Sequence, residues 1–154
     1  IYTHGHFDHI SGSDDIREKY KGVKHCVHAL DYDFFSDTKL NASGFFGGGI
    51  KCQAPEIQFK DGDTFKLKDI EFKVIHTPGH TQGGVCYLVD RMLFSGDTIF
   101  REAVGRCDLV GGDFAQIVGS IEDKIFTLPS DTIIYPGHGK LTSVEWEKEH
   151  NRFL

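Results

Sequence analysis

The chain has 154 residues, of which 39% are apolar and 26% charged, so it is long enough for one globular domain with a sizeable core and does not have the composition of a disordered chain. Its formal charge of -6 and the absence of a run of Lys and Arg argue against a nucleic-acid partner. No apolar stretch approaches the roughly 18 residues of a membrane span, and the four cysteines form no C-x-x-C pair, which is typical of reduced thiols in a cytoplasmic protein.

The first segment, residues 1–3, has the pattern of the end of a buried strand and leads at once into a dense histidine motif. A strand that ends three residues into the chain has no neighbours before it, so we expect that residues preceding Ile1 are missing from this sequence. A helix is predicted over residues 11–21, where Ser13 or Asp14 can cap the N-terminus.

A glycine-rich segment follows a predicted strand at 23–27 and a predicted helix at 29–35. It covers residues 36–54 and includes Phe45 and Phe46 beside several glycines. Such segments form loops that often lie over a functional site, and a plain surface loop is an equal alternative.

From residue 57 onward, short apolar runs predict strands, and two longer stretches predict helices. An Asp-Gly-Asp turn at 61–63 separates the first two of these strands, and Asp113 can cap the longer helix. Because strands and helices alternate, the expected fold class is α/β, in a single domain over residues 1–154. The strands are predicted at 57–59, 65–67, 70–76, 84–89, 92–95 and 132–135, and the helices at 113–128 and 144–153.

Three imidazoles and a carboxylate lie within six residues, as His4, His6, Asp8 and His9. So many polar groups are difficult to bury without a ligand, and they are the ligand types suited to zinc, iron and manganese. On an extended segment His4 and His6 project to one side. Asp8 and His9 follow where the chain turns into a helix and can point to a second position, so one short loop can supply two metal ions.

Three further candidate ligands, His80, Asp97 and His138, each directly follow a predicted strand. In α/β sheets, functional sites form where several strands end together. A carboxylate has two oxygens and can bridge two ions, which makes Asp97 the candidate for a shared ligand.

Together these motifs resemble the metal signature of the metallo-β-lactamase superfamily: THGHFDH at 3–9, a lone histidine, a Gly-Asp and a Gly-His. The segments HTPGHTQGG at 76–84 and SGDTIF at 95–100 resemble the glyoxalase II branch. The segment DTIIYPGHG at 131–139 resembles the short bacterial form of that branch, which lacks the C-terminal helical domain. The resemblance implies an αββα sandwich, here without its first strands and helix, and two divalent ions, with zinc favoured over iron or manganese. It assigns His4, His6 and His80 to one ion, Asp8, His9 and His138 to the other, and Asp97 to both.

The resemblance also implies an activity, the hydrolysis of a thioester such as S-lactoylglutathione by a metal-bound hydroxide. Asp8 or Asp97 is the expected catalytic residue that holds the attacking water. Arg106 resembles a basic residue that contacts glutathione, although it can instead pair with Asp108. The expected partner is therefore a small-molecule thioester or glutathione conjugate.

Two alternatives stay open at this point. A sister branch, the persulfide dioxygenases, uses a single Fe(II) ion, for which the ligands would be His4, His80 and Asp97. We favour the hydrolase because His138, in PGHG at 136–139, keeps the second metal position intact. The other alternative is a non-catalytic metal-binding fragment, which would follow if the physical chain begins at Ile1.

Overall fold

The computed structural model of the chain describes residues 1–46 and 48–154. The N-terminal half contains α1 (Phe7–Ile10), α2 (Ser13–Lys19), β1 (Cys26–His28), the 3-10 helix η1 (Ala29–Phe35), α3 (Ser43–Phe46), β2 (Ile57–Phe59), β3 (Thr64–Leu67) and β4 (Ile70–His76). The C-terminal half contains β5 (Val85–Val89), β6 (Met92–Gly96), β7 (Ile99–Phe100), β8 (Ala103–Val104), α4 (Phe114–Ser120), the π-helix η2 (Ile121–Ile125), β9 (Ile133–Pro136), β10 (Thr142–Ser143) and α5 (Val144–His150).

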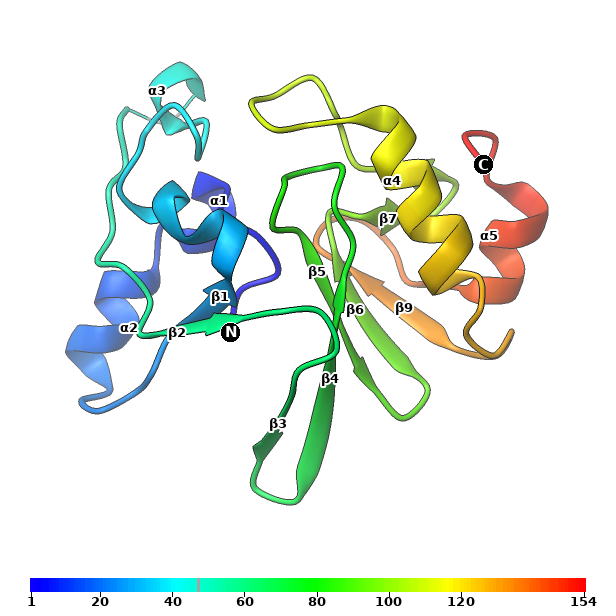
Figure 1. Cartoon of the computed structure of the whole chain (residues 1–154), viewed down its shortest axis with the longest axis horizontal. Helices are drawn as coiled ribbons and strands as arrows, with labels where there is room; N and C mark the ends of the chain where they lie inside the picture. The colour runs from blue at the N-terminus through cyan, green and yellow to red at the C-terminus, as the bar shows by residue number, and fades with distance from the viewer. Residues whose placement is uncertain (47) are drawn as a thin grey trace.

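A six-stranded sheet in the order β10-β9-β6-β5-β4-β3 forms the centre of the molecule (Figure 1). Its neighbouring strands are antiparallel except β6 and β9, which run parallel. Strands β4, β6 and β9 therefore share one direction, and their carboxyl ends lie at the same edge of the sheet. This edge is where the α/β class places a functional site.

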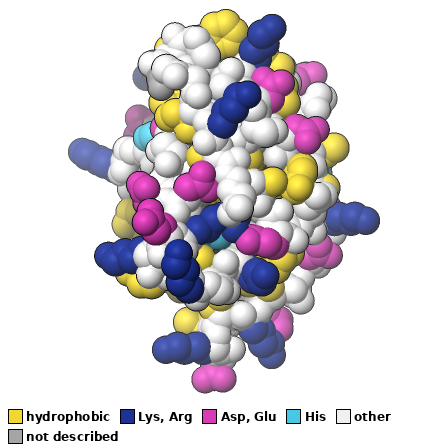
Figure 2. Space-filling view, turned by 90° about the vertical axis from the view of Figure 1, so that its left-hand side faces the viewer, with side chains coloured by type: hydrophobic (Ala, Val, Ile, Leu, Met, Phe, Trp, Pro, Cys, Tyr) yellow, Lys and Arg dark blue, Asp and Glu magenta, His cyan; other side chains and the backbone are white. Residues whose placement is uncertain are grey.

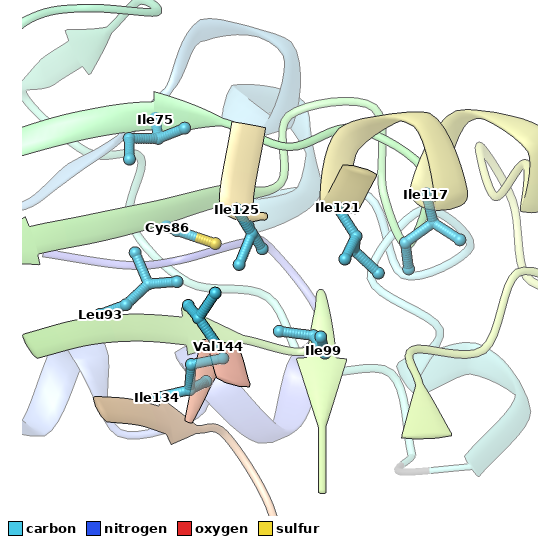
Figure 3. Close-up of a cluster of buried hydrophobic side chains, with 9 residues drawn as sticks. All are labelled: Ile75, Cys86, Leu93, Ile99, Ile117, Ile121, Ile125, Ile134 and Val144. Atoms are coloured by element: carbon cyan, nitrogen blue, oxygen red, sulfur yellow. The ribbon is translucent and has the colours of Figure 1, made fainter. Parts of the chain in front are cut away.

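Helical segments cover one face of the sheet, with α4 and α5 on the right in Figure 1. Ile117, Ile121 and Ile125 are spaced four residues apart and are completely buried, so they form one apolar stripe along α4 and η2. Figure 3 shows this stripe pointing toward Leu93 and Ile134, which project from the sheet. The resulting cluster is the main core.

The opposite face is covered by the N-terminal part of the chain from α1 to β2, where β1 and β2 form a separate parallel pair. Phe59 and Cys26 pack there against Val74 and Tyr87 of the sheet. This part also carries a mixture of acidic and basic side chains on its outer surface (Figure 2). Within the part of the chain that the structure describes, no helix is long and apolar enough to cross a bilayer.

The α/β class is confirmed, and most differences from the sequence prediction concern how elements end. The predicted helix over residues 113–128 begins as expected, with the Asp113 carboxylate accepting a hydrogen bond from the Gln116 amide at 3.0 Å. It then divides into the α-helix α4 and the π-helix η2, because the backbone hydrogen bonds come to span one more residue. The apolar stripe stays on the sheet through this change. The same helical face is buried either way.

The turn at 61–63 was expected between two neighbouring strands, but the flanking strands do not pair with each other. Strand β2 joins β1, and β3 pairs with β4. The turn itself bonds to β4, since Gly62 donates to the Val74 carbonyl and Val74 donates to the Asp63 carbonyl. The chain thus passes from one sheet to the other at this point.

Two N-terminal predictions are wrong. Residues 1–3 form no strand, although Tyr2 donates to the Cys26 carbonyl and Val85 donates to the Thr3 carbonyl, which places them between β1 and β5. Helix α2 is shorter than predicted and is preceded by Gly12, with no side-chain cap. Neither Ser13 nor Asp14 caps the N-terminus of this helix.

Candidate metal centre

The histidine motif forms the loop that enters α1, followed by the helix itself. His4 and His6 precede the helix and are almost completely buried, whereas Asp8 and His9 lie within this single-turn helix and are more accessible. The change from extended to helical backbone between them separates the two pairs of side chains. This is the local arrangement that the motif predicts.

One group of candidate ligands consists of His4, His6 and His80. The His80 Nε2 atom lies 2.9 Å from His6 Nδ1 and 3.3 Å from His4 Nε2. His80 reaches this position from the turn that follows β4, and the residue is 4% exposed. Three imidazole nitrogens therefore converge in a buried position.

A second group consists of Asp8, His9 and His138, at the more exposed side of the same cluster. The Asp8 Oδ2 atom lies 3.1 Å from His138 Nε2 and 3.5 Å from His9 Nε2. His138 follows β9 and its side chain is 58% exposed. Within each of the two groups, the potential ligand atoms all lie within 4.8 Å of one another.

Asp97 lies between the two groups, directly after β6. One carboxylate oxygen is 3.3 Å from His9 Nε2, and the other is 3.7 Å from His80 Nε2 and 3.6 Å from His138 Nε2. The same side chain thus faces both groups. The structure brings all seven sequence-predicted ligands into one cluster.

The cluster has the chemistry expected of a site for divalent metal ions. His9 Nε2 and Asp97 Oδ1 face each other, are buried, and have no hydrogen-bond partner among the described residues. Buried polar atoms of this kind are rarely left unsatisfied in proteins. A cation held between imidazole and carboxylate ligands satisfies them, so the residues present fit metal ions.

The electrostatics favour the neutral form of the buried histidines, which is the form that binds metal. Burial lowers the pKa of His4 well below its usual value, lowers that of His6 to about 4, and lowers that of His80. Burial also acts on His9, but the nearby Asp97 carboxylate outweighs it and raises the His9 pKa. The pKa of Asp97 is lowered because the surrounding imidazoles outweigh the effect of its burial.

Backbone contacts fix the orientation of two ligands. The His80 Nδ1 donates to the main-chain carbonyl of Arg106 at 2.8 Å, which leaves Nε2 free to face the cluster. Gly137 packs directly on the Asp97 carboxylate and the His9 ring, so that a side chain at position 137 would displace them. Only glycine at position 137 allows the backbone to approach Asp97 and His9 this closely.

A cavity of about 310 Å³ opens beside the cluster. Phe46 of α3 borders it, so the glycine-rich segment does lie beside the candidate site, while its Gly47 is outside the described residues. At the cavity wall, the Arg106 guanidinium makes two hydrogen bonds of 2.7 and 2.8 Å with the Asp108 carboxylate. Sequence reasoning did not identify the remaining apolar lining, which consists of Phe7, Ala42 and Leu109.

Residues 1–138 match the metallo-beta-lactamase superfamily. The chain is 31% identical over 157 residues to a Haemophilus influenzae protein named hydroxyacylglutathione hydrolase GloC, covering all of this chain and 74% of that protein. Both the signature and the overall sequence therefore resemble proteins of this superfamily.

Two solved structures show the same fold. The structure of BLEG-1 B3 metallo-beta-lactamase matches with a TM-score of 0.93 and 36% identity, over 98% of this chain and 74% of that one. The structure of TTHA1623 in a di-iron-bound form matches with a TM-score of 0.82 and 32% identity, over 99% of this chain and 75% of that one.

The buried histidines predict how the stability of the metal-free protein depends on pH. Their folded-state pKa values lie below the unfolded value of about 6.5, so the unfolded chain binds more protons as the pH falls. The stabilisation is fully present above about pH 6.5 and is lost as the pH falls toward about 4, the value for His6. We expect the Tm of chelator-treated protein to fall by about 5 °C or more between pH 7 and pH 5.

Two variants identify the source of this dependence in thermal melts. H6N removes one buried imidazole, so its Tm should fall less than the wild-type Tm between pH 7 and pH 5. H150N removes an imidazole whose side chain is 41% exposed, so its Tm should fall as much as that of the wild type. A Tm that stays constant in the wild type over this range would contradict the assignment.

Proposed function

The chain belongs to the metallo-beta-lactamase superfamily, and from this premise we propose that it is a dinuclear metal-dependent hydrolase that cleaves thioesters. The observation that carries the proposal is the position of Asp97, which faces both the His4–His6–His80 group and the Asp8–His9–His138 group. A complete pair of ligand groups with a shared carboxylate suits two ions rather than one. Zinc is the favoured metal, and the di-iron form of the similar TTHA1623 supports iron as well.

The proposed reaction uses the ligands and the adjoining cavity together. Two divalent ions in this cluster would supply hydroxide at neutral pH and polarise the substrate carbonyl. Asp8 borders the cavity and carries an accessible carboxylate, so it can accept a hydrogen bond from the attacking water. Asp97 stays ionised because its pKa is lowered, so it supplies a negative charge beside both ligand groups.

The leaving group distinguishes a thioester from an amide. A thiol has a pKa of about 8.5, so the thiolate departs without a strong general acid, whereas an amine must be protonated as it leaves. Among the described residues that line the cavity, each titratable side chain except Arg106 belongs to the proposed ligand set. Since Arg is effectively always protonated and does not give up its proton, a thioester is the better substrate for this site.

Arg106 is the proposed contact for an anionic part of the substrate, as in a glutathione conjugate. Its guanidinium lies at the cavity and also within 5.6 Å of the Phe46 ring centre. It is paired with Asp108, and this pairing holds the pKa of Asp108 at about 2. A substrate carboxylate would therefore compete with Asp108 for Arg106. The similarity to the protein named GloC supports glutathione thioesters as the first class to assay.

A mononuclear iron dioxygenase is the second candidate, since His4, His80 and Asp97 alone provide two imidazoles and one carboxylate around a common point. Oxygen consumption with a persulfide substrate would identify it. The presence of Asp8, His9 and His138 beside this triad favours the hydrolase.

The first test is thiol release from S-lactoylglutathione and from a neutral acyl thioester by the metal-loaded protein, followed with a thiol reagent. D97N should lower kcat at least about 100-fold, because it removes a ligand shared by both groups. The matched control is D131N, which alters an exposed carboxylate paired with Arg91 and should retain activity. Undiminished turnover by D97N, or no thioester turnover by the wild type, would contradict the proposal.

A second test concerns the Arg106–Asp108 pair. D108N frees the guanidinium, so the KM for S-lactoylglutathione should fall by about two- to five-fold, as expected for an exposed ion pair of modest strength. The KM for the neutral thioester should not change, and R106Q should raise only the KM of the anionic substrate. Equal shifts for both substrates would mean that Arg106 does not bind the anionic group.

A further inference from the structure

Asp31 is a completely buried carboxylate that sequence reasoning did not single out. It lies in η1 and does not line the cavity beside the metal centre. Its Oδ2 accepts hydrogen bonds from the Gly5 amide at 2.9 Å and the Thr81 hydroxyl at 2.7 Å, and its Oδ1 accepts one from the Gly83 amide at 2.7 Å. Both oxygens are thus satisfied by donors from elsewhere in the chain.

The three donors come from the two segments that supply the His4–His6–His80 group. Gly5 lies between His4 and His6, and Thr81 directly follows His80. Asp31 is far from both segments in sequence, 26 residues from Gly5 and 50 residues from Thr81. One carboxylate therefore holds together the backbones that carry all three imidazoles.

The packing around Asp31 leaves little freedom for either segment to move. A Cβ atom at Gly83 would lie 2.6 Å from both the Asp31 amide nitrogen and its Oδ1 atom. A Cβ atom at Gly5 would collide with the side chain of Phe34, which also belongs to η1. Both ligand-bearing segments are in direct contact with the same short helix.

The helix η1 is itself fixed on other parts of the fold. The Asn41 side chain donates to the Phe34 carbonyl at 2.8 Å, and the Cys52 amide donates to the Phe35 carbonyl at 2.7 Å. At its N-terminus, the Leu30 amide donates to His28 Nδ1. Asp31 therefore transmits the position of a well-anchored element to the ligands.

We propose that Asp31 is a positioning residue that sets the geometry of the three-histidine metal position by joining the loop of His4 and His6 to the loop of His80. The proposal rests on the metal centre of the proposed function and does not depend on the substrate. It concerns one of the two ligand groups, because Gly5 and Thr81 adjoin His4, His6 and His80, and none of the three donors adjoins Asp8, His9 or His138. Loss of the carboxylate should weaken the binding of one ion and leave the other in place.

The direct test uses D31N, which keeps the shape but replaces one acceptor oxygen by an amide nitrogen. In either orientation that nitrogen faces a backbone amide, of Gly5 or of Gly83, and cannot accept its hydrogen bond. Zinc binding is measured by competition with a chromophoric chelator, and ligand geometry by the visible spectrum of the cobalt-substituted protein. We expect one zinc ion to bind about 10- to 100-fold more weakly, with an altered cobalt spectrum.

Glu147 provides a matched control, because it is also a completely buried carboxylate with three donors, the Glu102 amide, the Thr142 hydroxyl and the Asn151 side chain. None of these donors adjoins a proposed ligand. E147Q should lower the Tm but leave both zinc affinities and the cobalt spectrum unchanged. A general loss of stability would alter both variants alike.

T81V is a milder second variant that removes only the hydroxyl donor and keeps the side-chain volume. It should weaken the same zinc ion by a smaller factor, which keeps the proposal testable if D31N fails to fold. Wild-type binding of both ions by D31N and T81V would overturn the role of Asp31, as would an equal loss in E147Q. Failure of the wild type to bind two ions would instead count against the metal centre itself.

Discussion

The carboxylate of Asp97 lies within 3.3 to 3.7 Å of imidazoles from two different ligand groups, and the arrangement of the sheet is what allows it to do so. Asp97 follows β6 and His138 follows β9, the one parallel pair of the sheet, so both residues leave it at the same edge. His80 follows β4, which runs in the same direction. The absence of a side chain at Gly137 then permits the close approach. The convergence of these candidate ligands results from strand direction as much as from residue type.

The metal position and the cavity are connected through a short segment. The main chain of Arg106 accepts the hydrogen bond that orients His80, while its side chain lies at the cavity wall beside Asp108. A change in the conformation of this segment would therefore affect a candidate ligand and the proposed substrate contact together. On the other side of the cluster, Asp31 holds the same His80 loop against the histidine motif. The ligand at the centre is thus supported from two directions.

Local sequence patterns predicted the seven residues that the structure brings into one cluster, and the helix that covers the main core. Four of the seven candidate ligands lie in one short histidine motif, and the other three each follow a strand. Ile117, Ile121 and Ile125 recur with helical periodicity and are buried. The α/β class followed from the alternation of these elements. Asp31 could not be found in this way, because its importance comes from contacts more than 25 residues away. No local pattern reports such contacts.

Strand pairing and helix ends were the other features that local reasoning missed. The turn at 61–63 has the composition of a hairpin, yet β2 pairs with the distant strand β1, and β3 pairs with β4 across the short turn at 68–69. The two short strands β7 and β8 were not predicted, since two-residue strands have no detectable periodicity. On α2, Ile16 and Tyr20 lie four residues apart, but both are largely exposed. Periodicity alone does not say what a helical face contacts.

The most direct test of the account is the metal content of the purified full chain, determined by elemental analysis together with protein concentration. A shared Asp97 between two complete ligand groups predicts two divalent ions per chain, reduced by the H138A variant, which removes a ligand from only one group. One iron ion per chain that is unaffected by H138A, or no bound metal at all, would contradict the dinuclear centre.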